Sequence, residues 1–381
     1  MDVLHDVDFG IAGAPGYTEL AGRLMGHADL RTRGGARGFV QLAVVQQTGR
    51  RPNVREQDES AIDVTQAFVD LPLTLGQVRA VARLGRQELD LSGNRLVTSR
   101  DGATLRRAFQ GAKLDVALGG WKLAMLSVRP MALREEPFAD RPDRTERFNA
   151  VSLDLPPALS AGGSLNLFYL DRDRSDARWL RAQGNERRYS FGAHYIRQAG
   201  PWRTEAQGTW QTGRVHDMPI RAYGAALSVD RDLATRTPLS IGVDLVAASG
   251  DKGGTRRIET FDPIYPNNFG LSDAPLFYQT NYVFGGGSVS ARWAGATWTL
   301  GSNLLVRHST TDAVYANGRP IPAAFGTQRL TSLLSQVSVR RPVARNYEVY
   351  VSLVRAQALG ALRGVGGENA FYSRAQLTAR F

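Results

Sequence analysis

The side chains best able to do chemistry in this sequence are arginines, and many occupy alternate positions within otherwise apolar segments. A guanidinium group stays charged at physiological pH and can grip a carboxylate with two parallel N–H donors. If the alternation reflects β-strands, these groups project from one face and form a surface that attracts anions. The basic residues that strand parity assigns to this face are Arg23, Arg79, Arg83, Arg107, Lys113, Arg292, Arg307, Arg374 and Arg380.

Other chemistries find little support. Cysteine is absent, which excludes disulfide scaffolds, thiol nucleophiles and cysteine-based zinc sites. None of the five histidines has metal-ligand spacing with another, and no G-x-S-x-G nucleophile motif occurs. The glycine run at 285–287 lacks the Lys-Ser/Thr that completes a phosphate loop, so a strand bulge or a close contact explains it better. We therefore expect no enzymatic activity, no metal and no cofactor.

The segments that must position the arginines alternate with a period of two. In residues 370–381, Phe371, Leu377 and Phe381 fall on one face, while Arg374 and Gln376 fall on the other. The same split recurs in residues 18–31, 189–198, 202–211 and 297–308. A soluble antiparallel sandwich also alternates, but its strands average about five or six residues. These segments have ten or more residues, the length that a tilted membrane strand needs.

Short and long connections alternate along the chain. Tight turns are predicted at 32–35, 73–76, 119–120, 199–201, 294–295 and 342–345, and long polar loops at 49–60, 91–103, 133–145, 173–186, 249–279 and 310–327. Short turns on one rim and long loops on the other are typical of transmembrane barrels. We predict an all-β fold: one transmembrane antiparallel β-barrel over residues 1–381, with short periplasmic turns and long extracellular loops.

About 17 strands are clear, and bacterial single-chain barrels have an even number. A short opening strand at 7–14 makes 18, and 16 is the alternative if a weaker segment belongs to a loop. The chain starts without a basic segment followed by an apolar one, so we expect that the export signal was removed or truncated and that the protein lies in the bacterial outer membrane.

Several motifs resemble those of the alginate-export family of outer-membrane porins. Residues 83–89 read R-x-G-R-Q-x-L, a following loop ends in R-D-G at 100–102, and the next strand opens R-R-x-F-x-G at 106–111. The segments 27–31, 66–71 and 261–270 and the terminal Arg-Phe add to the resemblance, which covers essentially the whole chain. It implies an 18-stranded barrel with an electropositive lumen that conducts anionic polysaccharide or related uronates outward. The chain departs from the family pattern at Glu88, where a cation is expected.

The leading functional prediction is a channel for anionic saccharides, either a polymer or uronate oligosaccharides. The alternatives are a general anion-selective porin without a polymer role, and a barrel whose loops plug the lumen. The luminal arginines either attract the solute or pair with luminal carboxylates to stiffen the wall. The loop arginines form a constriction or an outer funnel, or bind lipopolysaccharide phosphates at the rim; they are Arg86, Arg95, Arg100 and Arg106.

The net charge of +11 also raises nucleic acid as a partner. We exclude it because the basic residues alternate with apolar ones along strands and form no patch with exposed aromatics. The expected partners are outer-membrane lipid and lipopolysaccharide, an anionic saccharide and, for an exporter, periplasmic secretion proteins. We expect a monomer. Residues 249–279 are the best candidate for an inward loop or lid, and a plain surface loop is the alternative.

Overall fold

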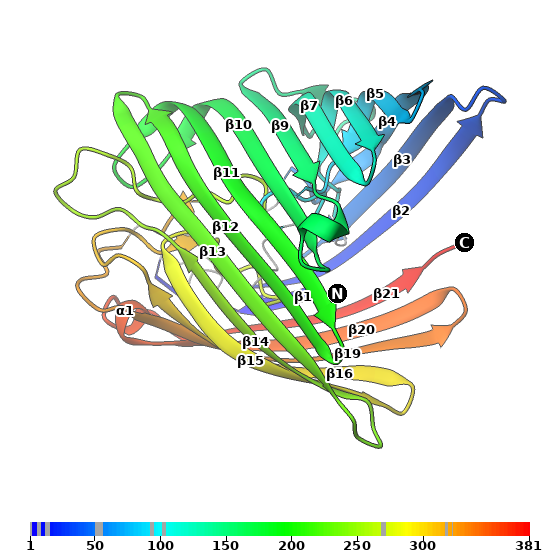
Figure 1. Ribbon diagram of the computed structural model, residues 1–381. Helices are drawn as coiled ribbons and strands as arrows, with labels where there is room; N and C mark the ends of the chain where they lie inside the picture. The colour runs from blue at the N-terminus through cyan, green and yellow to red at the C-terminus, as the bar shows by residue number, and fades with distance from the viewer. Residues whose placement is uncertain are drawn as a thin grey trace.

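A computed structural model describes residues 2–5, 9–11, 16–49, 56–91, 95–100, 104–267, 272–316, 319–321 and 323–381. Within them 18 antiparallel strands form one continuous ladder, and short strands β8, β17 and β18 lie in loops (Figure 1). The strands are β1 (Asp2–His5), β2 (Tyr17–Arg31), β3 (Arg37–Thr48), β4 (Ser60–Leu75), β5 (Val78–Glu88), β6 (Ala108–Leu118), β7 (Trp121–Ala132), β8 (Arg141–Pro142), β9 (Glu146–Asp154), β10 (Ser164–Arg178), β11 (Gln183–Ala199), β12 (Trp202–Val215), β13 (Met218–Leu233), β14 (Leu239–Ala248), β15 (Tyr282–Trp293), β16 (Ala296–Arg307), β17 (Tyr315–Ala316), β18 (Arg319–Pro320), β19 (Leu330–Ala344), β20 (Tyr347–Ala358) and β21 (Ala370–Ala379).

The strand pairing runs in a full circle. Each long strand pairs with its neighbours in chain order, and β1 pairs with both β2 and β21. Asp2 lies opposite Glu19 on one side and opposite Arg374 on the other. The prediction of an 18-stranded barrel is confirmed, but its opening strand is Asp2–His5 rather than 7–14. Of that predicted strand, residues 7–8 and 12–14 lie outside the described part of the chain.

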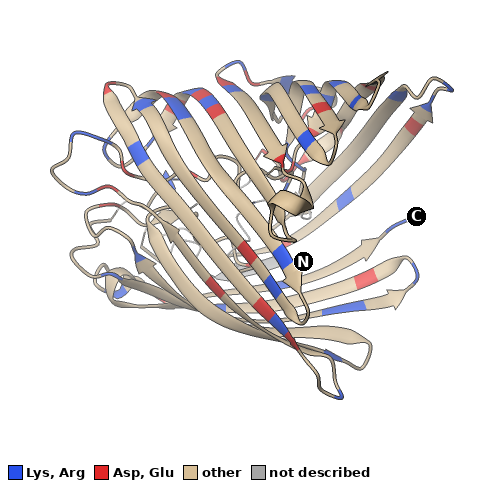
Figure 2. Cartoon of the chain, viewed as in Figure 1, with Lys and Arg blue, Asp and Glu red and all other residues tan. Residues whose placement is uncertain are grey.

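Alternation along each strand separates a lipid-facing side from a lumen-facing side. In β2, Leu20 and Leu24 are 62 % and 74 % exposed on the outward side, whereas Glu19 is 3 % exposed on the inward side. Charged residues on the visible outer face gather toward the two ends of the strands and leave an uncharged band between them (Figure 2). A band of this kind matches the hydrocarbon thickness that a barrel must present to lipid.

Connections differ strongly at the two ends of the barrel. At the periplasmic end most strands are joined by tight turns, such as the one between Leu75 and Val78, and the connection from β9 to β10 is longer and holds a short 3₁₀ helix (Pro157–Leu159). The long connections include α1 (Gly360–Arg363) and gather at the opposite, extracellular end. The predicted loop at 173–186 is mostly strand instead, because β10 and β11 stay paired as far as Arg178 and Gln183. The described part of the chain contains no helix long and apolar enough to cross a membrane.

The described parts of three of these connections fold into the barrel. We call the connections at residues 89–107, 249–281 and 308–329 the first, second and third inward loops. Their apolar side chains join inward-facing residues of the wall in one buried cluster. Leu96 and Val97 of the first inward loop lie in it beside Phe261, Tyr265 and Phe277 of the second. Packing of this kind is what narrows the lumen.

Candidate functional site

An arginine cluster on the wall of β10 and β11 forms the base of the constriction. Arg172 and Arg188 are 2 % and 0 % exposed, and both point inward with Arg174. All three contact the buried carboxylate of Glu186: Arg174 donates to it at 2.7 Å, Arg188 donates to it, and Arg172 lies 3.7 Å away. Three guanidinium groups around one carboxylate leave excess positive charge that needs a further anion.

The second inward loop supplies that anion as Asp262. Its carboxylate accepts from Arg172 and lies 3.3 Å from the guanidinium of Arg174. The loop backbone is bound too, since the carbonyls of Thr260 and Ile264 accept from Arg188 and Arg172 at 3.1 Å each. Burial opposes ionisation of Asp262, but the guanidinium groups outweigh it and hold the pKa of this carboxyl below its usual range. The loop is therefore docked by a buried ion cluster.

Tyr265 of the second inward loop contacts the first inward loop and the barrel wall. Its ring packs edge-on against Phe109 and Phe148 at 5.1 and 5.2 Å, and its hydroxyl donates to Glu146 at 2.5 Å. The Arg107 guanidinium lies 5.2 Å from the ring centroid and donates to the carbonyl of Thr98 at 3.2 Å. Burial lowers the pKa of Arg107, although a guanidinium remains charged at neutral pH.

Above the ion cluster lies a polar chamber of about 290 Å³, which we call the vestibule. It sits where the three inward loops meet the extracellular end of β10. Of the residues that the structure describes, five guanidinium groups and two carboxylates line it, so the formal charge of this lining is positive. The lining residues are Arg100, Arg107, Arg174, Asp176, Arg178, Trp179, Asp262, Pro266, Tyr278 and Arg319. This arrangement can hold an anion about the size of one sugar unit.

The first inward loop also reaches the wall of β12 and β13. Arg95 donates to the hydroxyl of Ser228 at 3.1 Å, and its Nε lies 3.8 Å from the Glu205 carboxylate. Glu205 also bonds His194 Nε2 at 3.0 Å, so both histidine and arginine converge on it. Because β12 and β13 are far from β5 and β6 in the ladder, the first inward loop spans the lumen rather than lying along its own wall.

The sequence model for alginate export matches residues 1–339. The chain belongs to the alginate export family. Among curated proteins, no sequence matches. Solved structures show the fold: OccAB4 of Acinetobacter baumannii is 12 % identical, with 99 % of this chain and 95 % of that one covered at a TM-score of 0.62. OpdQ of Pseudomonas aeruginosa is also 12 % identical, with coverages of 100 % and 95 % and a TM-score of 0.62.

Another similar structure is OccK2 (OpdF) of Pseudomonas aeruginosa, which was solved in complex with glucuronate. It is 12 % identical, covers 100 % of this chain and 96 % of its own, and has a TM-score of 0.55. Family and fold together establish an outer-membrane porin channel, not an enzyme, in the bacterial outer membrane.

This alginate-export member has most of the predicted wall arginines on the lumen-facing register. Arg83 forms a two-pronged ion pair with Asp70 at 2.6 and 2.8 Å and lies 3.8 Å from the centroid of the Phe68 ring. Lys113 lies 3.0 Å from Asp115, so these cations pair with carboxylates of the wall. The remaining predicted lumen-facing cations are Arg23, which donates to the carbonyl of Thr104 at 2.9 Å, Arg79, Arg292 and Arg374.

Two predicted pore residues have other surroundings. Arg307 faces inward but is 2 % exposed, because the third inward loop covers it and supplies the carbonyls that its guanidinium binds. Arg86 lies opposite Ala67 on the outward register, at the point where β4 and β5 separate. Its guanidinium pairs with Asp63 at 3.0 Å and donates to the carbonyl of Asp140 at 3.3 Å, so it closes this seam.

The other predicted loop arginines separate as well. Arg95 and Arg100 lie within the constriction, whereas Arg106 pairs with Glu88 at 3.3 Å. Glu88 is the position that departs from the family pattern, and its carboxylate thus has a basic partner. Of the motif residues, Gly93, Asn94, Asp101, Gly102 and residues 268–270 lie outside the described part of the chain.

The sequence reasoning missed the most buried cations, Arg172 and Arg188, and the vestibule residues Arg178 and Arg319. Residues 173–186 were assigned to a loop because six of the fourteen are charged and only four are apolar, too few to mark a lipid-facing side. A usable signal was present before that segment: Phe168, Leu170 and Arg172 share one parity, which continues through Arg174. Extending that parity would have placed Arg172 and Arg174 inside the barrel, and the parity of Ser190 and His194 on the next strand would have done the same for Arg188.

A buried carboxyl pair in the inward loops predicts a dependence on pH. Asp251 is fully buried; Asp312 accepts from its backbone N–H at 2.8 Å, and Arg181 and Glu259 lie nearby. Burial raises the pKa of Asp251 from 3.8 to about 6, and the Asp312 carboxylate adds to the shift. The Asp251 carboxyl thus holds its proton more tightly when the loop is docked than when it is undocked. The free energy of docking is therefore most favourable below pH 3.8, becomes less favourable as the pH rises to about 6, and is constant above that pH.

We therefore expect backbone amides of residues 249–262 to exchange more slowly at pH 5 than at pH 8, after correction for intrinsic exchange rates. Hydrogen exchange with mass spectrometry measures this difference. Asp251→Asn, which carries no titrating proton, should show the same protection at both pH values. A pH difference that survives in Asp251→Asn would contradict this assignment.

Proposed function

We propose that this channel passes uronate-bearing saccharides, with the vestibule as the point where their carboxylates are gripped. The observation that carries the proposal is the placement of five guanidinium groups against two carboxylates at the narrowing formed by the inward loops. Guanidinium binds a carboxylate in the same two-pronged way that Arg83 binds Asp70. Every sugar unit of a uronate chain carries a carboxylate that a guanidinium group can bind in this way. A neutral sugar has no such group.

Transport requires that the solute also leave. The vestibule arginines differ in their surroundings: Arg174 forms an ion pair with Glu186, whereas Arg178 and Arg319 are exposed to solvent. Exposed cations bind an anion weakly and are screened by salt. Below the constriction, Arg83 and Lys113 also face the lumen, but each pairs with a wall carboxylate, so they can attract a solute anion only weakly. A carboxylate can thus move between several weak sites, which suits conduction better than one tight site.

The family suggests that the solute is a polymer, since alginate is a chain of uronate units. A vestibule of about 290 Å³ would admit such a chain only in single file. The alternative is a general anion-selective porin without a polymer role, and the glucuronate complex of the similar OccK2 favours a solute of one sugar. The two differ in whether longer oligomers enter.

Single-channel recording in a planar bilayer tests the proposal. We expect an anion-selective current that uronate trimers block and that neutral trisaccharides of the same length do not. Arg178→Gln together with Arg319→Gln should weaken block by roughly tenfold, as expected for loss of charge-assisted hydrogen bonds. The effect should shrink as salt is raised.

Arg214→Gln is the matched control, because Arg214 is exposed near the same rim but on the outward register of β12. It should leave block unchanged. The block should also be compared for glucuronate oligomers of one to six units. If longer oligomers block the current no more strongly than the monomer, the small-solute porin is favoured. A current indifferent to uronates, with or without the vestibule substitutions, would remove the saccharide function and leave the porin fold intact.

A further inference from the structure

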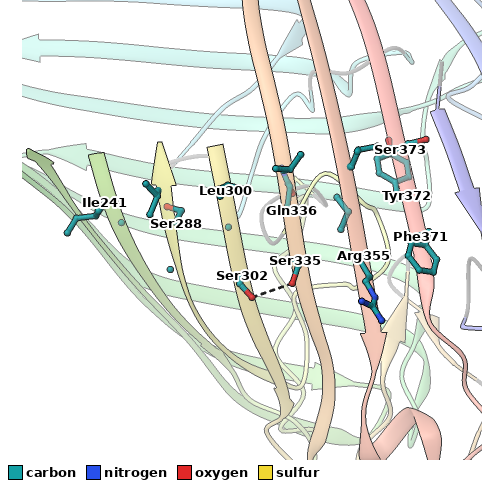
Figure 3. Close-up of a pocket in the computed structure, with 17 residues that line it drawn as sticks. Ile241, Ser288, Leu300, Ser302, Ser335, Gln336, Arg355, Phe371, Tyr372 and Ser373 are labelled. Atoms are coloured by element: carbon teal, nitrogen blue, oxygen red, sulfur yellow. Dashed lines mark hydrogen bonds between the residues drawn. The ribbon is translucent and has the colours of Figure 1, made fainter. Parts of the chain in front are cut away.

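The outer surface of the barrel is hollowed by a groove of about 930 Å³ that crosses six neighbouring strands, from β14 to β21 (Figure 3). Its lining forms three rows that follow the strand pairing. Two rows belong to the outward register and flank one row of the inward register, so the groove opens toward lipid. The first outward row is Gly287, Ser302, Ser335, Arg355 and Phe371; the second is Ile241, Val289, Leu300, Val337, Leu353 and Ser373.

The two outward rows form the two walls of the groove. Their side chains differ in size, and both rows are largely uncharged. Small residues form the middle of the first wall, where the hydroxyls of Ser302 and Ser335 bond to each other at 3.4 Å. Aliphatic side chains such as Leu300 and Leu353 form the second wall and are 58 % and 54 % exposed. Outward rows on a strand lie about 7 Å apart, and six strands extend over about 24 Å. A narrow apolar trough of this length suits one extended hydrocarbon chain.

The only charged residue of the lining is Arg355, at one end of the groove beside the Phe371 ring. No carboxylate of the described residues forms an ion pair with it. Arg355 lies eight residues above Tyr347, which packs against Phe381 at the periplasmic rim. With strands tilted by about 45°, this is roughly 19 Å along the membrane normal, near the extracellular boundary of a hydrocarbon band about 25 Å thick. A flexible arginine there can reach the headgroup layer.

We propose that this groove is a lipid-binding site: it holds one acyl chain of an outer-leaflet lipopolysaccharide, and the Arg355 guanidinium contacts a phosphate of the same molecule. The apolar trough matches the chain, and the unpaired cation at its upper end matches the phosphate. A second copy of this protein fits less well, because a two-fold contact would place the concave groove against itself and leave it empty. The site is separate from the lumen and does not depend on which solute the channel passes.

Native mass spectrometry of the delipidated protein, titrated with lipid A in detergent, tests this site. The wild-type protein should retain one lipid A more tightly than additional copies. Arg355→Gln should weaken that binding roughly tenfold, and dephosphorylated lipid A should bind the wild type as weakly as lipid A binds Arg355→Gln. Ser335→Phe, which fills the groove, should abolish the tight equivalent.

Two substitutions outside the groove serve as controls. Arg221→Gln removes an exposed outward arginine of β13, and Ala225→Phe adds a ring to the outward register of the same strand. Both should bind lipid A like the wild type, and heat-modifiable migration checks that every variant is folded. Equal binding by all variants would overturn the proposal. A dimer or trimer that Ser335→Phe dissociates would also overturn it, by showing that a second copy occupies the groove.

Discussion

Asp262→Asn should release the second inward loop and increase the single-channel conductance. Asp262 is 1 % exposed and pairs with the buried guanidinium group of Arg172 and the half-buried one of Arg174. Asparagine keeps the shape and can still accept from the N–H of Ile264, a bond of 2.9 Å in the native protein, but it brings no charge. Removing one partner of a buried ion pair costs about 3–5 kcal/mol. That cost falls on loop docking, because the barrel wall is held by its own strand pairing.

Planar-bilayer recording and limited proteolysis of residues 249–281 measure the release. Arg172→Gln added to Asp262→Asn removes both charges and should restore much of the native conductance, since replacing a whole buried pair is far less costly than breaking it. Asp217→Asn, an exposed aspartate in the turn between β12 and β13, should behave like the wild type. Native conductance and protease resistance in Asp262→Asn would show that the ion cluster does not hold the loop.

Arg307→Lys should free the third inward loop even though the positive charge is kept. The guanidinium donates to the carbonyls of Thr310, Asp312, Phe325, Gly326 and Gln328, and so joins both ends of this loop to β16. Lysine has a single ammonium with three donors and cannot reproduce this planar fork. Each buried carbonyl left without a partner costs about 1–3 kcal/mol, so the loss of several should undock the loop.

Proteolysis within residues 308–329, followed by mass spectrometry of the fragments, reports this undocking. Arg329→Lys is the matched control, because Arg329 is exposed and, among the described residues, its side chain bonds the carbonyl of His308 alone, at 3.0 Å. We expect cleavage to accelerate in Arg307→Lys and to stay at the native rate in Arg329→Lys. Equal rates in the two variants would mean that Arg307 acts as one more luminal charge, as its strand parity alone suggests.

Both predictions concern inward loops that are held in the lumen by buried polar contacts as well as by apolar packing. An apolar plug would be insensitive to single charge changes, but a loop docked on Arg172 and Arg188 responds to any change in the balance of charge. The same cluster leaves Arg178 and Arg319 exposed in the vestibule. The arginines that dock the loop thus lie next to those that attract the anion. For a substitution in either group, both the conductance and the rate of proteolysis should be measured.

The sequence by itself determined the barrel and the side on which most wall residues lie. Arg83 and Asp70 could be assigned to the lumen because side chains alternate along a strand, and this depends only on each residue's position relative to its neighbours. Lipid on one side makes the pattern strict, since one shifted residue would place a charge in hydrocarbon. The short turns were readable from the same local information, whereas the alternation left 16 or 18 strands open and the evenness came from a general property of bacterial barrels.

Only the tertiary structure decided which cations are available to a solute. Arg307 and Arg83 have the same inward parity, yet one is sealed by a loop and the other lies along the wall. Arg172 and Asp262 are 90 residues apart, and nothing in the local pattern of either predicts their contact. Loop docking depends on the shape of the closed lumen and on the summed charge within it. The shape and charge of the lumen exist only once the strands have closed into a barrel. The alternation of side chains along each strand therefore could not predict how the loops dock.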